Sequence, residues 1–134
     1  MFISEIQIRV RYAETDQMGY VYYGNYATYF EVARVEALRA LGFSYKSLEE
    51  SGVMLPVMNY SIDYLKPAYY DDLLTIKITI RELPSARIRF EYETYNEKDV
   101  VINKANTTLV FINKSTNRPC KAPDDFMQMI SKYF

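Results

Sequence analysis

Apolar spacing near the N-terminus indicates a strand followed by a long helix. Residues 5–12 alternate between apolar and polar side chains, a period that is typical of a half-buried strand. Residues 25–41 change to the helical period. The apolar side of the strand is expected to hold Ile6, Ile8, Val10 and Tyr12. The buried helix face is expected to hold Ala27, Phe30, Arg34, Ala37, Leu38 and Leu41, with Ala33 and Ala40 beside it.

Capping residues indicate where the helices begin and end. Asn25 suits the N-cap of the long helix, and Gly42 suits the position just past its C-terminus, where a left-handed backbone is common. A second, short helix is expected to begin after Ser44 and to end at Gly52.

The rest of the chain is mostly strand. The expected strands are 53–66, 73–82, 87–95 and 100–113, and the expected turns are 83–85, 96–99 and 113–119. A closing helix is expected over 123–133. Short turns between consecutive strands imply antiparallel pairing. The sequence therefore predicts a single α+β domain over residues 1–134, in which the long helix lies across an antiparallel sheet of about five strands.

Composition narrows the class of protein. The chain has 134 residues and a net charge of -1, which argues against a nucleic-acid binder, because such proteins need a basic surface. No apolar run is long enough to span a membrane. Glu5 and Arg9 interrupt any secretion signal. One cysteine cannot form an internal disulfide, so we expect a cytoplasmic protein.

The chain contains no histidine. This excludes a Ser-His-Asp triad, a Cys-His dyad and a histidine-ligated zinc site. Cys120 has no base to activate it and is expected to be structural. Catalysis would have to come from carboxylates, phenols, lysines, hydroxyls or backbone amides, and we expect no metal or redox cofactor.

The segment 11–26 is the candidate site, because it leads from a strand through a turn into a helix N-terminus. Backbone N–H groups there are unpaired and can stabilise an oxyanion. Asp16 lies seven residues before Tyr23, and its carboxylate could attack an acyl carbon or deprotonate water. A turn or capping role for Asp16, and a packing role for the clustered tyrosines, remain open alternatives.

The motif RYAETDQMGYVYYGNY over 11–26, with YFEVAR over 29–34, resembles the 4-hydroxybenzoyl-CoA thioesterase-like acyl-CoA thioesterases. The segments DYLKPA (63–68) and DDL (71–73) are also similar to this family. The resemblance covers nearly the whole chain. It implies the hot-dog fold, in which a curved antiparallel sheet wraps around a long helix.

The resemblance also assigns roles to residues. Asp16 matches the catalytic carboxylate, acting as nucleophile or general base, and Tyr23 falls where the family supplies a backbone N–H to the thioester carbonyl. Many bacterial members carry histidine at that position. Gly24, Asn25 and Tyr26 match the motif and are expected at the substrate site, with Asn25 capping the helix and Tyr26 lining the pocket.

Positive charge is needed for the phosphates of CoA. In similar proteins, basic residues from the corresponding regions meet the nucleotide at the rim. The candidates are Arg87, Arg89, Lys114, Arg118 and Lys121. Glu31 and Arg34 lie beside apolar helix positions and are expected to form an ion pair within or between subunits.

These features predict an acyl-CoA thioesterase that hydrolyses a small acyl-CoA to free acid and CoA, with acyl carrier protein as an alternative carrier. The resemblance implies a homodimer or homotetramer with active sites between subunits. One alternative is a non-catalytic module that binds acyl-CoA or acyl carrier protein. The other is a hot-dog hydratase or dehydratase, although similar proteins of that branch use an Asp-His pair, which this chain lacks.

Overall fold

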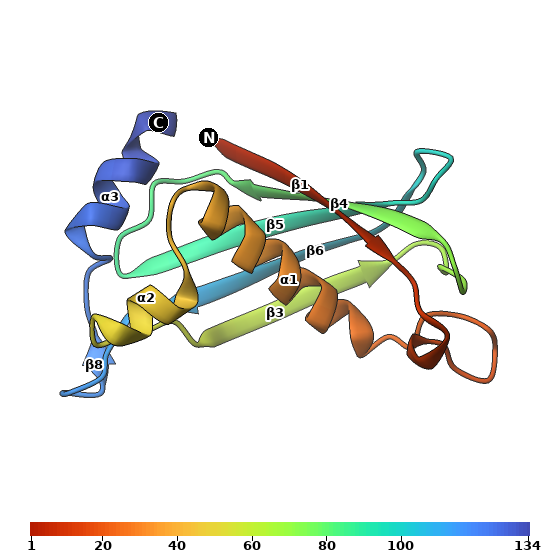
Figure 1. The fold of residues 1–134 in the computed structure, drawn as a ribbon, viewed down its shortest axis with the longest axis horizontal. Coiled ribbons are helices and arrows are strands. Elements are labelled where there is room, and N and C mark those ends of the chain that lie inside the picture. The colour runs from red at the N-terminus through yellow and green to blue at the C-terminus, as the bar shows by residue number, and fades with distance from the viewer.

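The computed structural model describes residues 1–134 and contains one large antiparallel sheet with a long helix across one face (Figure 1). In spatial order the strands are β1 (Phe2–Arg9), β4 (Leu73–Ile80), β5 (Arg87–Tyr95), β6 (Val101–Val110) and β3 (Val57–Tyr64). The helices are α1 (Asn25–Ala40), α2 (Tyr45–Glu50) and α3 (Asp124–Ile130), with 3-10 turns at Tyr12–Glu14 and Ser131–Tyr133. The predicted α+β architecture is confirmed.

A second, small sheet lies beside the large one. It consists of β2 (Val53–Met54), β7 (Ile112–Asn113) and β8 (Arg118–Pro119). The predicted strands 53–66 and 100–113 are each divided in the structure, since Leu55 and Pro56 separate β2 from β3 and Phe111 separates β6 from β7. Phe111 joins the two sheets, because its N–H donates to the carbonyl of Ala86 beside β5 and its carbonyl accepts from the N–H of Cys120 beside β8.

The core lies between α1 and the concave face of the sheet. Alternate residues of β4 and β5 face the helix and are buried, and α1 packs against β1 and β4. Burial of this apolar surface is the main force that holds the helix on the sheet. The buried residues of α1 are Tyr26, Tyr29, Phe30, Ala33, Arg34, Ala37 and Leu38.

The predicted helix face is partly wrong. Ala27 and Ala40 are exposed, whereas Tyr26 and Tyr29 are buried. Because α1 leans towards β1 and β4, its Ala27 side is left uncovered. Tyr12 was also expected inside, but it lies in the 3-10 turn after β1 and is 77% exposed.

The two ends of α1 differ in how well the sequence predicted them. Gly24, not Asn25, occupies the N-cap position and provides no side-chain cap. At the other end Gly42 has φ +89°. The N–H of Gly42 donates to the Arg39 carbonyl at 3.0 Å, and that of Phe43 donates to the Leu38 carbonyl at 2.9 Å. This pattern is a Schellman C-terminus, as predicted.

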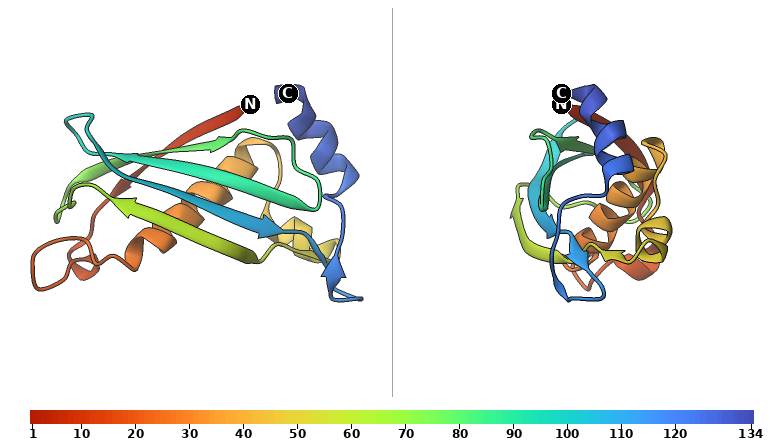
Figure 2. Two further views of the ribbon diagram at one scale, coloured as in Figure 1. Left: turned by 180° about the vertical axis from the view of Figure 1, so that it is seen from behind. Right: turned by 90° about the vertical axis from the view of Figure 1, so that its left-hand side faces the viewer.

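The shorter elements agree with the sequence analysis. Ser44 caps α2 through its side chain, which accepts from the N–H of Ser47. Asn96 organises the β5–β6 hairpin, because its Oδ1 accepts from the N–H groups of Lys98 and Val100. Figure 2 shows that α2 and α3 lie at one end of the molecule and the loop before α1 at the other.

Candidate active site

The loop between β1 and α1 holds Asp16 in a fixed orientation. Oδ1 of Asp16 accepts hydrogen bonds from the N–H of Met18 at 2.9 Å and of Tyr20 at 3.3 Å. The backbone N–H of Asp16 donates to the Tyr20 carbonyl at 2.8 Å. Gly19, with φ +81°, makes the tight turn between them. Oδ2 accepts no hydrogen bond from the protein, so one carboxylate oxygen is anchored and the other remains available.

A groove of about 300 Å³ lies beside this carboxylate. Three segments form it: the loop that carries Asp16, the first turn of α1 and the end of β3. Its lining residues are Asp16, Met18, Tyr20, Val21, Tyr23, Tyr26, Tyr64, Leu65, Lys66 and Pro67. The structure thus brings the predicted residues Asp16, Tyr23 and Tyr26 together at one apolar groove.

The backbone of Tyr23 presents a free donor at the start of α1. Its carbonyl accepts from the N–H of Tyr26 at 3.3 Å and from the Tyr64 hydroxyl at 3.4 Å. Its own N–H donates to no acceptor within the protein. This N–H lies at the positive end of the helix dipole, where it can stabilise negative charge on an oxygen. Tyr23 as a whole is 64% exposed.

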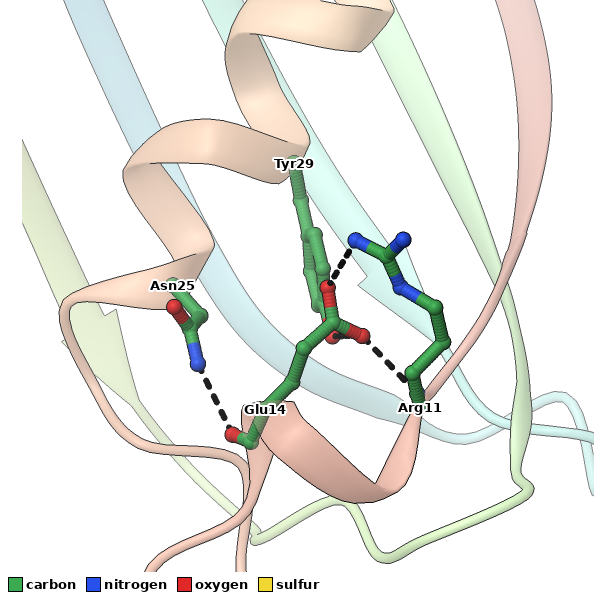
Figure 3. A network of polar contacts seen from close by, with 4 residues as sticks. All are labelled: Arg11, Glu14, Asn25 and Tyr29. Carbon is green, nitrogen blue, oxygen red and sulfur yellow. Dashed lines mark hydrogen bonds and ion pairs between the residues drawn. The ribbon is translucent and has the colours of Figure 1, made fainter.

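A polar network braces the loop against α1 (Figure 3). Oε1 of Glu14 accepts from the Tyr29 hydroxyl at 2.9 Å and from the N–H of Arg11 at 2.8 Å, and Oε2 pairs with the Arg11 guanidinium at 3.0 Å. The Glu14 carbonyl accepts from the Asn25 side chain at 2.8 Å. Asn25 therefore joins the loop to the helix, which corrects the expectation that it caps α1.

The same network shifts the pKa values of Glu14 and Tyr29. Partial burial acts to raise the pKa of Glu14, but the hydrogen bonds from Arg11 and Tyr29 outweigh it and lower that pKa. Burial and the bond to Glu14 raise the pKa of Tyr29. Sequence reasoning missed Glu14 and Tyr29 as supports of the site. The spacing of Arg11 and Glu14 could have indicated their ion pair, but nothing local pointed to Tyr29.

Two further motif residues differ in their relation to the groove. Gly24 does not line it, and a Cβ there would lie 2.8 Å from Cε2 of Tyr22. Tyr26 lines the groove and is otherwise buried. Burial and the neighbouring Tyr64 phenol raise the pKa of Tyr26 to about 12, so its hydroxyl stays neutral at physiological pH.

The predicted CoA-binding cations do not meet the groove within one chain. Arg87 and Arg89 begin β5, and Lys114 and Arg118 lie at the small sheet, at the end away from Asp16 (Figure 2). All four are exposed, and so is Lys121, the fifth predicted cation, which also does not line the groove. Lys66, which sequence reasoning did not single out, is the one basic residue that lines the groove, and it forms no ion pair.

The predicted pair of Glu31 and Arg34 is not formed within the chain. Arg34 instead donates to the hydroxyls of Tyr45 and Tyr92, and Glu31 is exposed. No three His, Cys, Asp or Glu side chains gather as a metal site would need. No helix has the length and apolar composition that crossing a membrane requires.

Comparison with known proteins shows the family to which this chain is similar. A family model described as the thioesterase-like superfamily matches residues 10–130. YneP of Bacillus subtilis is 35% identical over 119 residues, which are 89% of this chain and 86% of that protein. The acyl-CoA thioesterase YbgC of Haemophilus influenzae is 33% identical over 119 residues, 88% of this chain and 87% of that protein.

Solved structures support the same family. A DHNA-CoA thioesterase from Staphylococcus aureus superposes with a TM-score of 0.93 and 36% identity, covering 99% of this chain and 91% of that one. The long helix on a five-stranded antiparallel sheet is the hot-dog fold that the sequence predicted. The chain belongs to the thioesterase-like superfamily.

Proposed function

We propose that this protein hydrolyses acyl-CoA thioesters to the free acid and CoA, with Asp16 and the N–H of Tyr23 as the catalytic groups. One observation carries the proposal: Asp16, whose carboxylate is anchored through one oxygen only, and Tyr23, whose N–H just before α1 is unpaired, line the same apolar groove. Relatives named acyl-CoA thioesterase and acyl-CoA thioester hydrolase support the reaction.

The two groups divide the chemistry between them. The thioester carbonyl oxygen accepts from the N–H of Tyr23, which stabilises the oxyanion as the carbonyl carbon is attacked. Asp16 either attacks that carbon itself, giving an acyl-enzyme anhydride that water then hydrolyses, or removes a proton from the attacking water. In both routes the acyl–sulfur bond breaks and the thiolate of CoA leaves. No imidazole takes part, because the chain has no histidine.

Two sets of basic side chains can supply positive charge for the phosphates of CoA. Lys66 lies at the groove, where it can contact a phosphate as a point charge. Arg87, Arg89, Lys114 and Arg118 lie at the far end of their own chain, so they can reach this groove only from a second subunit. A phosphopantetheine carried by acyl carrier protein would meet the same Lys66.

The edge of the sheet supports a homodimer. β3 pairs with β6 on one side only, and its Val57, Met58, Tyr60 and Tyr64 are exposed. A long apolar edge strand is a template for pairing with another chain, and β3 also lines the groove. A homodimer across β3, or a homotetramer built from it, would place the active site between subunits. A monomer in sedimentation velocity at micromolar concentration would contradict this arrangement.

Release of free thiol from short, long and aromatic acyl-CoAs tests the activity. We expect Asp16→Asn to lower kcat/KM by at least ~100-fold, the scale of losing a general base or nucleophile. Asp99→Asn is the matched control. Asp99 lies in the β5–β6 hairpin with φ +61°, a conformation that asparagine also tolerates. Hydrolysis of no thioester by the wild type, or full activity in Asp16→Asn, would refute the proposal.

The anchoring of Asp16 also fits a module that binds acyl-CoA without turnover, because two backbone N–H groups already bond its Oδ1 as in a structural turn. In that case the wild type would bind a non-hydrolysable acyl-CoA thioether in calorimetry but release no thiol from the corresponding thioester.

A further inference from the structure

Arg34 is a buried cation without an anionic partner. It lies in the middle of α1 and is only 7% exposed. Its Nε donates to the Tyr45 hydroxyl at 3.3 Å, and its Nη1 donates to the Tyr92 hydroxyl at 3.1 Å. The Tyr92 hydroxyl in turn lies 2.6 Å from Oγ1 of Thr107. Burial raises the pKa of Tyr45 and of Tyr92, so these partners are neutral hydroxyls.

Arg34 keeps a positive charge and N–H donors that no protein group pairs with. No ion pair involves Arg34, and its Nη2 donates to no protein acceptor. A guanidinium remains charged at any physiological pH, and its burial is costly unless an anion compensates it. Its planar fork matches the two oxygens of a carboxylate. The site therefore favours a carboxylate ligand.

A cavity of about 100 Å³ gives access to this side chain. It lies between α1 and β3, the same two elements that form part of the Asp16 groove and that both extend towards the Asp16 loop (Figure 1). The lining residues are Ala27, Phe30, Arg34, Val57, Tyr60 and Thr107.

Two aromatic contacts between α1 and β3 connect the groove to the cavity. The Tyr26 and Tyr64 rings, which line the groove, lie 5.8 Å apart, and the Phe30 and Tyr60 rings, which line the cavity, lie 6.2 Å apart. Tyr26 and Phe30 are four residues apart on a helix, and Tyr60 and Tyr64 are four apart on a strand, so each set shares one face. Aromatic side chains of both elements therefore lie along the α1–β3 interface between the groove and the cavity.

We propose that the Arg34 cavity binds the far end of the acyl group and that this end carries a carboxylate. The proposal rests on the function proposed above, because the thioester must lie at Asp16 and Tyr23. Tyr23 lies two residues before α1, and the five residues from Asn25 to Phe30 add about 7.5 Å along the helix. The Arg34 side chain leans back by about one turn towards the helix N-terminus. A medium-chain dicarboxylic acid, esterified to CoA at one end, has the matching length.

A pair of substrates that differ only at the far end tests this assignment. Suberoyl-CoA ends in a carboxylate, and octanoyl-CoA of the same chain length ends in a methyl group. We expect the wild type to prefer suberoyl-CoA in kcat/KM by about tenfold or more, the effect of a charge-assisted hydrogen bond. Arg34→Met should abolish this preference, and Arg34→Lys should retain part of it.

Arg39→Met is the matched control, because Arg39 lies on the same helix but is exposed and pairs with Glu36. It should keep the wild-type preference. The ratio of the two substrates cancels any general loss of folded enzyme. Equal kcat/KM for the two substrates in the wild type would overturn the proposal. An unchanged ratio in Arg34→Met, together with dissociation of this variant into monomers, would also overturn the proposal. That result would mean that Arg34 binds a partner subunit and not the substrate.

A binding measurement separates failure of this proposal from failure of the proposed function. If the wild type hydrolyses no thioester, the thioesterase proposal fails, and titration calorimetry with octanoate and with 1-octanol, which lacks the carboxylate, still decides the cavity. Binding of octanoate about tenfold tighter than 1-octanol, lost in Arg34→Met and kept in Arg39→Met, supports a carboxylate site. Equal binding of the acid and the alcohol contradicts it.

Discussion

The Tyr29 hydroxyl donates to Oε1 of Glu14 at 2.9 Å and so links the second turn of α1 to the loop that carries Asp16. The two residues are fifteen positions apart in the chain. Together with the Asn25 bond to the Glu14 carbonyl at 2.8 Å, this contact holds the loop next to the helix N-terminus. The position of Asp16 relative to the free N–H of Tyr23 depends on this link.

Removal of the Tyr29 hydroxyl should loosen the loop. We expect Tyr29→Phe to lower the free energy of unfolding by about 1–2 kcal/mol, because a half-buried carboxylate loses a hydrogen bond. The measurement is equilibrium unfolding in urea. Tyr12→Phe is the control, since the Tyr12 hydroxyl makes no hydrogen bond and the residue is 77% exposed. Equal stability of the two variants would show that the link contributes nothing.

Stability should fall in acid in a way that depends on Glu14. Hydrogen bonds from Arg11 and Tyr29 outweigh partial burial and lower the pKa of Glu14 below its ordinary value of 4.5. A lowered folded-state pKa stabilises the protein above the unfolded pKa, and this contribution disappears as the pH falls through the folded-state pKa. The stability difference between wild type and Glu14→Gln should therefore be constant near neutrality and shrink below pH 4.5.

Urea unfolding at a series of pH values measures this difference. Glu97→Gln is a suitable control. Glu97 is also a carboxylate that accepts a backbone hydrogen bond, from Leu73 at 2.9 Å, but it is exposed. A gap between wild type and Glu14→Gln that stays the same from neutrality into acid would contradict the assigned pKa direction.

The activity should depend on the backbone N–H of Tyr23 more than on its ring. Tyr23→Phe and Tyr23→Ala both keep the N–H and should change kcat by less than about tenfold. Tyr23→Pro removes the N–H and should lower kcat by about 100-fold, the usual effect of losing one oxyanion donor. Thiol release measures the rate, and circular dichroism checks that each variant folds. A collapse of activity in Tyr23→Phe would instead make the phenol the catalytic group.

Local patterns were enough to predict most of the fold. Alternation in 73–80 and 87–95 predicted two strands of the sheet, and Gly42 predicted the end of α1, because both signals depend only on neighbours in the chain. Pattern reasoning also reached Asp16 and the N-terminus of α1, since a turn that leads into a helix is a local feature. The absence of histidine limited the chemistry at this place to carboxylates, phenols, lysines, hydroxyls and backbone donors.

Only the tertiary structure decided which side chains support and extend the site. Glu14 meets Tyr29 because the loop folds back on the helix, Lys66 reaches the groove from the end of β3, and Arg34 finds neutral hydroxyls on other elements instead of Glu31. These contacts join residues far apart in the chain, and they follow from how α1 sits on the sheet. Periodicity along the chain determines which face of each element is buried, but packing between elements determines what that face meets.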